Sequence, residues 1–130
     1  MQKLVIVLGL AALAVSPVSA QITYGESVPV QLEAIEDLDA CTLGMVANVG
    51  PDSSAMVRTG PDSEYDTIDY LADGDLVWVC QSDGEHYGIV YSSDPDLDCE
   101  VSSPVEATVN YSGPCDTGWV MSDWVEIIAG

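Results

Sequence analysis

The chain has 130 residues, of which 22 are Asp or Glu and only 2 are Lys or Arg, so its formal net charge is −20. Proteins that bind nucleic acids need basic side chains to displace the counterions of the phosphates, and this composition therefore excludes most polyanion binding. The acidic balance favours either solubility in a salty or crowded medium, or attraction to a cationic partner or to divalent ions.

Residues 1–20 have the pattern of a signal peptide. Lys3 precedes an apolar run over residues 4–15, and small residues lead to the end of the segment. We expect export to the periplasm or out of the cell, with Gln21 as the first mature residue and Arg58 as the single remaining basic residue. The apolar run is shorter than the roughly 20 residues of a membrane-spanning helix, so no membrane span is expected in the mature form.

Residues 21–40 read as an acidic linker with few aromatic side chains. Leu32, Ile35 and Leu38 have the spacing of one face of a short helix. We expect this stretch to dock weakly on a single domain that begins near Cys41 and continues to the end of the chain, over residues 41–130.

Short apolar runs separated by Gly, Pro, Asp and Ser make up most of the rest of the chain. Such regularly spaced runs are typical of a small all-β barrel or sandwich. The expected strands cover residues 43–49, 55–59, 67–71, 76–80 and 86–91.

In the run 76–80, Val77 and Val79 alternate with Trp78. If the two valines fill the interior of the fold, then Trp78 faces outward. An uncovered indole would leave a large apolar area in water, and the segment 92–117 is long enough to cover it. Its apolar residues are Leu97, Val101, Val105 and Val109.

Three motifs follow one another along this pattern. They are Met56-Val57-Arg58-Thr59-Gly60-Pro61-Asp62-Ser63-Glu64-Tyr65, then Gly74-Asp75-Leu76-Val77-Trp78-Val79, and finally Gly118-Trp119-Val120-Met121-Ser122-Asp123-Trp124. In this order they resemble the N-V-R-x-G-P-x-x-x-Y, G-x-x-V-x-V and G-W-V-x-x-x-aromatic motifs of bacterial SH3-type domains. The resemblance implies a small SH3-like β-barrel over residues 41–130 that binds a ligand and is not an enzyme.

The chain departs from that family at three places. Met56 replaces the usual Asn, His86 stands where the family often has Trp, and residues 92–117 form an insertion where a tight turn is usual. A connection of this length is uncommon in a compact domain unless it is stabilised, so we expect a disulfide-stapled insertion.

Within the first and last motifs, four residues are expected to be structural. Gly60 and Pro61 set a fixed turn. The guanidinium of Arg58 should bond to a loop carboxylate or carbonyl and not to a ligand. The family resemblance implies that Trp119 helps to close the barrel.

Four cysteines in an exported domain favour two disulfides, and three pairings are possible. The resemblance implies Cys41–Cys80, since the first strand and the next long strand lie close in an SH3-type barrel. The remaining pair, Cys99–Cys115, would close the insertion locally. No C-x-x-C pair is present, so a structural metal is not expected.

The resemblance also implies an aromatic groove for an extended peptide, lined by Tyr65, Tyr70, Tyr87 and Trp124. An alternative is that Tyr87 and Trp124 belong partly to the core. The implied partners are peptidoglycan stem peptides or an envelope protein. The competing interpretation is a secreted structural or accessory protein, or an inhibitor, without a ligand groove.

Two other groups of residues are candidate sites of chemistry. Cys80 and His86 lie on neighbouring expected strands, but a nucleophilic pair needs a free thiolate, and no catalytic residue or cofactor is expected. Residues 94–98 carry acids at alternate positions like the start of a calcium loop. The turn Gly and the bidentate Glu of such a loop are missing, so a solvated acidic loop is expected.

Overall fold

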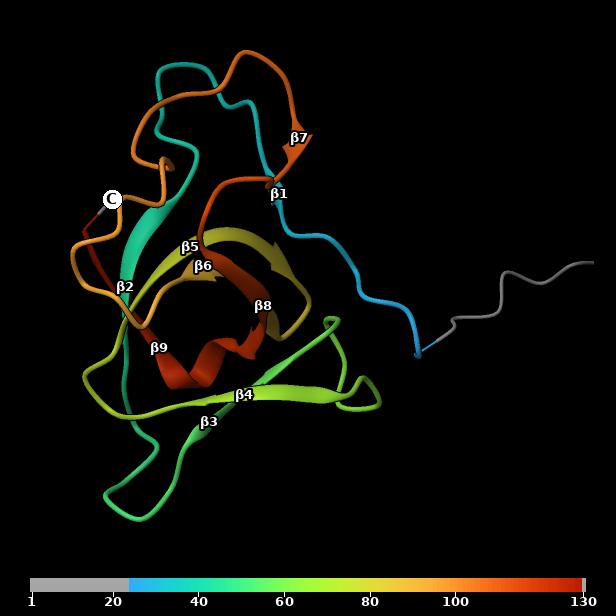
Figure 1. Cartoon of the computed structure of the whole chain (residues 1–130), viewed down its shortest axis with the longest axis vertical. Coiled ribbons are helices and arrows are strands. Elements are labelled where there is room, and N and C mark those ends of the chain that lie inside the picture. The colour runs from blue at the N-terminus through green and yellow to red at the C-terminus, as the bar shows by residue number, and fades with distance from the viewer. Residues whose placement is uncertain (1–23, 130) are drawn as a thin grey trace, which may run out of the picture.

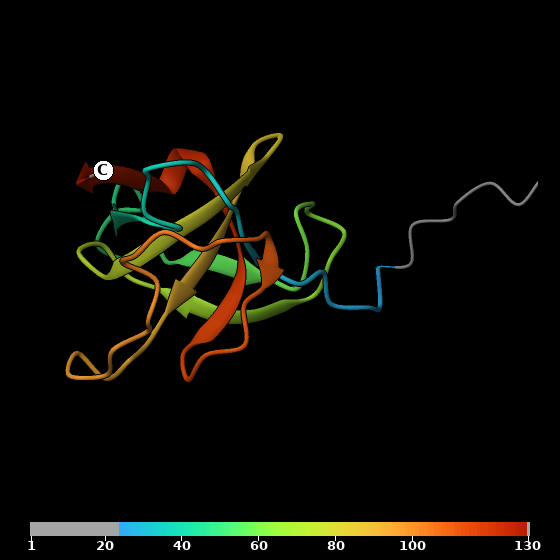
Figure 2. The same cartoon turned by 90° about the horizontal axis from the view of Figure 1, so that it is seen from above.

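The computed structural model of the chain describes residues 24–129; the expected signal peptide and mature N-terminus lie outside these residues. The described part is an all-β structure, seen from two directions in Figures 1 and 2. Its elements are β1 (Gln31–Leu32), β2 (Thr42–Val46), β3 (Ala55–Arg58), β4 (Thr67–Leu71), β5 (Leu76–Asp83), β6 (His86–Tyr91), β7 (Val109–Asn110), β8 (Asp116–Met121), the 3-10 helix η1 (Ser122–Trp124) and β9 (Val125–Ala129).

Seven of the strands form one antiparallel sheet in the order β4-β3-β8-β6-β5-β2-β9, which curves around its own concave face (Figure 1). The short strands β1 and β7 pair separately, with Gln31 opposite Asn110. The expected strands 67–71 and 86–91 coincide with β4 and β6. Strands β1, β7, β8 and β9 were not among the strands expected from the sequence. No helix in the described residues is long and apolar enough to cross a bilayer.

The central strands β5, β6 and β8 bury apolar side chains on both faces. On the concave face lies an inner cluster, which we define as Val46, Val49, Ala55, Val57, Leu71, Val77, Ile89, Tyr91, Val120 and Val125. On the opposite face lies an outer cluster of Val30, Leu32, Ala40, Cys41, Cys80, Val90, Cys99, Val101 and Trp119. Neighbours such as Ile89 and Val90 therefore belong to different clusters, as the alternation of side chains in a strand requires.

The segment expected as a linker contributes to this outer cluster. Val30 and Leu32 are buried there, and the backbone N–H of Val28 donates to the carbonyl of Thr59 at 2.8 Å. Leu32 lies in β1, and Ile35 and Leu38 are exposed, so the short amphipathic helix does not form. The reason is tertiary: Trp119 and the segment that carries β7 offer these residues an apolar surface and a strand partner.

The loop after β3 is closed by Arg58. Its Nη1 donates to the carbonyl oxygen of Tyr65 at 2.9 Å, so the anchor is a loop carbonyl, one of the two partners expected. A Cβ on Gly60 would lie 2.5 Å from the ring of Tyr65, which explains why glycine stands there. Pro61 occupies the same turn, and the N–H of Asp62 donates to the carbonyl of Gly60 at 2.9 Å.

Trp119 is only 2% exposed and lies on the outer face of β8. Its Nε1–H donates to the carbonyl of Val28 at 2.9 Å, which holds the N-terminal segment against the sheet. The ring lies over Gly88, where a Cβ would come within 3.1 Å of it. Trp119 is therefore a packing residue that joins two layers.

The two disulfides are Cys41–Cys80 and Cys99–Cys115, the pairing expected from the resemblance. The first joins the residue before β2 to β5 in the outer cluster. The second lies within the long loop, which we define as residues 92–115, between β6 and β8. Stable disulfides are typical of proteins in an oxidising environment.

Candidate ligand-binding groove

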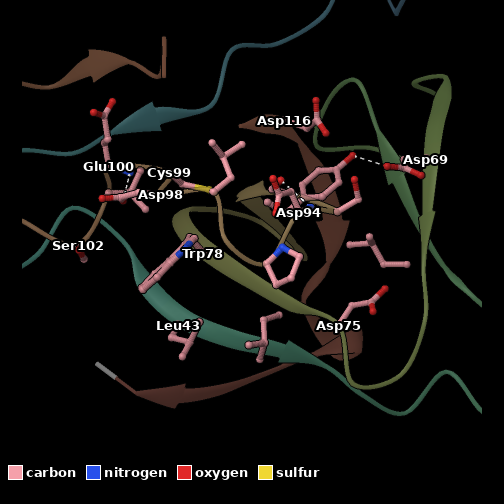
Figure 3. A pocket seen from close by; sticks show the side chains of 18 of the residues that line it. Leu43, Asp69, Asp75, Trp78, Asp94, Asp98, Cys99, Glu100, Ser102 and Asp116 are labelled. Carbon is pink, nitrogen blue, oxygen red and sulfur yellow. Dashed lines mark hydrogen bonds between the residues drawn. The ribbon is translucent and has the colours of Figure 1, made fainter. Parts of the chain in front are cut away.

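A groove of about 750 Å³ lies where the long loop passes beside β4, β5 and the start of β2. We call it the Trp78 groove, because Trp78 lies partly buried in its wall (Figure 3). Its other apolar lining residues are Leu43, Tyr70, Leu71, Leu76, Tyr91, Pro95, Leu97 and Val101.

Strand alternation places Trp78 here. Val77 is buried in the inner cluster, so Trp78 projects from the opposite face of β5 and packs against the outer cluster, together with Val105. This is the face that the sequence predicted. The expectation of full cover by the loop is corrected: Leu97 and Val109 are exposed, and Val109 pairs with Leu32 instead. Trp78 therefore keeps an accessible face.

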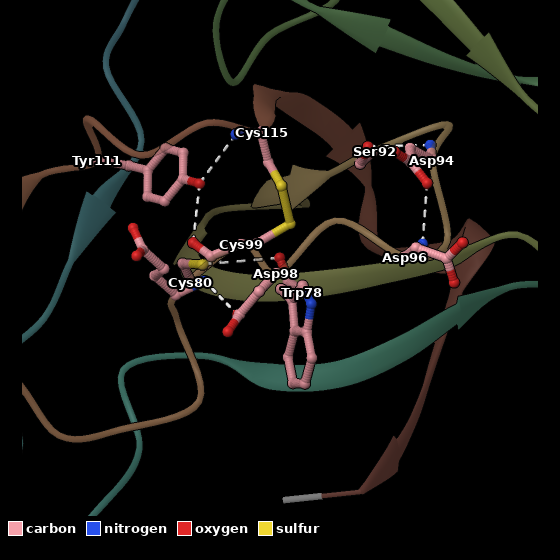
Figure 4. The surroundings of a disulfide bond; sticks show 10 residues. Trp78, Cys80, Ser92, Asp94, Asp96, Asp98, Cys99, Tyr111 and Cys115 are labelled. Atoms are coloured by element: carbon pink, nitrogen blue, oxygen red, sulfur yellow. Dashed lines mark hydrogen bonds between the residues drawn. A yellow bond between two sulfur atoms is a disulfide. The ribbon is translucent and has the colours of Figure 1, made fainter.

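The part of the long loop that lines the groove is held in place by the Cys99–Cys115 disulfide and by Tyr111 (Figure 4). The Tyr111 hydroxyl donates to the carbonyl of Cys99 at 2.9 Å and accepts the N–H of Cys115 at 3.1 Å. The covalent bond and the two hydrogen bonds connect the same two stretches of chain. The long loop is therefore anchored where it lines the groove.

Six carboxylates line the groove, namely Asp69, Asp75, Asp94, Asp98, Glu100 and Asp116. Besides Asp69, three of them are oriented by backbone N–H donors. Asp75 accepts from Ala72 at 2.9 Å, Asp94 from Asp96 at 2.9 Å and Asp98 from Glu100 at 2.8 Å. Each of these bonds engages one carboxylate oxygen, so the other is available to a ligand.

The half-buried Asp69 and the buried Tyr91 form a hydrogen-bonded pair at the edge of the groove. The Tyr91 hydroxyl donates to Oδ2 of Asp69 at 2.9 Å, and the N–H of Tyr70 donates to Oδ1 at 2.8 Å. Burial raises the pKa of Tyr91 well above its ordinary range, and the hydrogen bond and negative charge of Asp69, together with the charge of Asp116, raise it further. Tyr91 thus remains a neutral donor.

A second groove of about 880 Å³ lies on the other side of Trp78. Trp78, Leu43 and Ser102 line both grooves, so the two are neighbours across the indole. The second is more apolar, and its wall includes Ile35, Leu38 and the Cys41–Cys80 disulfide. Its acids are Glu33, Asp37 and Asp39.

The four aromatic residues expected to form one groove lie apart. Tyr70 is 63% exposed and lines the Trp78 groove. Tyr87 and Trp124 pack partly buried against the inner cluster, as in the alternative that assigns them to the core. Tyr65 is 8% exposed, and its ring meets the edge of Tyr24 with centroids 5.0 Å apart. Of the four, only Tyr70 lines either of these two grooves.

Of the groove acids, the sequence singled out only Asp94 and Asp98, within the acidic loop 94–98; the others were not marked, because nearly every loop of this chain offers a carboxylate. The sequence feature that indicated the position of the groove was Trp78, an outward-facing indole beside a long loop. Residues 94–98 form the rim, and within residues 24–129 no set of three or more His, Cys, Asp or Glu side chains has a metal-binding arrangement. Cys80 is bonded to Cys41 and His86 is buried, so these two do not form a nucleophilic pair.

Comparison of the chain with known family models, with curated proteins and with solved structures found no match.

Proposed function

We propose that the chain is an exported, non-catalytic, SH3-like binding module, and that its ligand occupies the Trp78 groove. The observation that carries this proposal is the partly buried indole of Trp78 in the wall of a groove of about 750 Å³. Recognition grooves typically combine an apolar aromatic surface with a few oriented polar groups, and both are present here.

Two features support the SH3-like assignment. The Arg58, Gly60 and Tyr65 positions of the first motif form one closed loop, and Gly118 of the last motif lies against Val57, where a Cβ would collide. The motifs thus explain local packing, as residues of a shared signature do. Export is supported by the pattern of residues 1–20 and by the two disulfides.

The ligand classes proposed are a peptidoglycan stem peptide or a peptide segment of an envelope protein. A secreted structural or inhibitory protein without a ligand groove is the competing function. The partly accessible indole favours binding over it, because a purely structural surface gains nothing by leaving Trp78 in contact with water.

The test follows the indole N–H resonance of Trp78, assigned by its loss in Trp78→Phe. Soluble muropeptides, or peptides tiled across the exported proteins of the same cell, are titrated into the disulfide-bonded chain. Binding at the groove shifts the Trp78 resonance but leaves the buried Trp119 resonance in place. The matched control is Ile68→Thr, which removes an exposed apolar side chain outside the groove. If no peptide of either class moves the Trp78 resonance, the competing function stands.

A further inference from the structure

We infer that the groove accepts a cationic peptide segment, with a Lys or Arg side chain of the partner lying on Trp78 between the groove carboxylates. This inference rests on the proposed function and names the chemistry of the ligand. It is argued from the apolar surface of the groove, from its charge and from its continuation past Trp78.

The apolar part of the groove matches the stem of a long basic side chain. Leu43, Leu76 and Leu97 lie around Trp78 in the lining, and Leu76 is 56% exposed. Lys and Arg bury their methylene stems on apolar surfaces while their charged ends remain with polar groups. The face of an indole attracts such a cation more strongly than other aromatic rings do.

The charge of the groove has one sign throughout. Its lining contains six acids and no Lys or Arg. Arg58, the only Lys or Arg in residues 24–129, already donates to the carbonyl of Tyr65. Figure 3 shows Asp98 and Glu100 to one side of Trp78, and Asp94 and Asp75 to the other. An acidic peptide would be repelled from every direction, whereas a basic one finds complementary charge on both sides of the ring.

The second groove extends the same chemistry. It continues past Trp78 with Ile35 and Leu38 as apolar side chains and Asp37 and Asp39 as acids. An extended peptide projects alternate side chains to opposite sides, so a segment that alternates basic and apolar residues could occupy both grooves. A peptide fits this length, whereas a single metal ion would need clustered ligands, and such a cluster is absent from the described residues.

The probe is a nonapeptide that alternates Lys and Leu, added to the disulfide-bonded chain while the Trp78 indole resonance is followed. Three comparison ligands are the same peptide with Glu for Lys, the same peptide with Gly for Leu, and calcium ions. We expect the Lys-Leu peptide to shift the Trp78 resonance, the Glu peptide to leave it in place, and the Gly peptide to bind more weakly. High salt should weaken the binding, because it screens the charge pairs.

The variants are Glu100→Gln and Asp98→Asn, with Glu64→Gln as the matched control. Glu64 is an exposed acid that lines neither groove, so its change alters the net charge equally. We expect each groove variant to weaken binding by about two- to fivefold, as for a partly exposed charge pair, and the control to change it little. Trp78→Leu, which lacks the reporting indole and is therefore followed by calorimetric titration, should weaken binding more than either single charge change.

The outcomes separate the two proposals. If muropeptides or neutral peptides shift the Trp78 resonance and the Lys-Leu peptide does not, the groove binds a ligand but the cationic partner is wrong. If the Glu peptide binds as well as the Lys-Leu peptide, or if the groove variants bind like Glu64→Gln, the inference is overturned. If calcium alone shifts the Trp78 resonance, the ligand of the groove is a metal ion and the inference of a cationic peptide is wrong. If nothing moves the resonance, both proposals fail.

Discussion

The hydroxyl of Tyr91 on β6 donates a hydrogen bond of 2.9 Å to Oδ2 of Asp69 on β4, which is the strand at one end of the sheet. These strands are not neighbours, since β3 and β8 lie between them. The pair therefore spans the concave face of the sheet and holds its edge strand against the inner cluster.

This pair predicts a pH dependence at the alkaline end. In the unfolded chain Tyr91 loses its proton near pH 10, whereas its raised pKa keeps the folded state protonated to higher pH. The folded state then binds more protons than the unfolded state, so the contribution to stability is complete below about pH 10 and falls as the pH rises above it. Tyr91→Phe should make the decline shallower, as measured by urea unfolding at several alkaline pH values.

At neutral pH the same variant should lower the free energy of unfolding by about 1–2 kcal/mol, because it removes a hydrogen bond to a charged group. Tyr70→Phe is the control, since Tyr70 is exposed and its hydroxyl makes no hydrogen bond within residues 24–129. If the free energy of unfolding falls equally with alkaline pH in both variants, the raised pKa of Tyr91 is not the cause of the decline.

Arg58→Lys should lower the free energy of unfolding by about 1 kcal/mol. The positive charge stays, but the planar guanidinium that reaches the carbonyl of Tyr65 is lost. Thermal melting checks this prediction, and an unchanged melting temperature would count against a structural role. Because the substitution preserves the positive charge, any decrease in the free energy of unfolding comes from the lost hydrogen-bond geometry at the loop.

Trp119→Phe should loosen the N-terminal segment. An aromatic ring is kept, although it is smaller than the indole and packs less on Gly88, whereas the hydrogen bond from Nε1 to the carbonyl of Val28 is removed. Hydrogen exchange should quicken over residues 28–32, including the N–H of Val28 that donates to Thr59, with little change in β2. Exchange that quickens evenly over the whole sheet would show a global loss of stability instead of a local one.

Removing the Cys99–Cys115 disulfide with a double serine variant should lower the free energy of unfolding by about 3 kcal/mol in the chain-entropy model, for a sequence separation of 16. It should also free the long loop and make Trp78 more accessible to acrylamide. The comparison is removal of the Cys41–Cys80 disulfide by a double alanine variant, which leaves the hydrogen bonds of Tyr111 in the long loop intact. Quenching that is equal in the two variants would show that the disulfide does not hold the groove wall.

Glu100 has a φ of 62°, a left-handed conformation that costs a residue with a Cβ about 1 kcal/mol or more. Glu100→Gly should therefore leave stability unchanged or raise it by up to about 1 kcal/mol, because glycine accepts this conformation but loses more entropy on folding. Glu100→Gln keeps the strain and should be neutral. Both changes should weaken the binding of the Lys-Leu peptide to the groove. A glycine variant that melts lower would show that Glu100 supports the fold.

The sequence predicted the parts of the fold that local patterns determine. The alternation in β5 placed Val77 inside and Trp78 outside, and the turn residues bounded β4 and β6 correctly. It did not reveal β1 and β7, because each has two residues and exists through pairing with the other and through the outer cluster. No local pattern marks a strand of that length.

The candidate site was predictable only in part. Trp78 was recognised as exceptional from alternation, but its groove depends on where the long loop returns, and that is fixed by Cys99–Cys115 and Tyr111. The aromatic groove inferred from family resemblance was not found as one surface. Tyr87 and Val120 pair across β6 and β8 on the concave face, whereas Tyr70 projects from the other face of β4.

The pairing of Gln31 with Asn110 joins residues 79 positions apart. A chain that emerges with its N-terminus first leaves Val30 and Leu32 without their apolar partners until the segment that carries β7 and Trp119 has followed. The sheet strands β2 to β6 can pair earlier, because they are consecutive or nearly so. The outer layer, like the closing strands β8 and β9, therefore waits for the end of the chain. Any event that delays this end prolongs the time during which Val30 and Leu32 are open to chaperones, proteases and other unfolded chains.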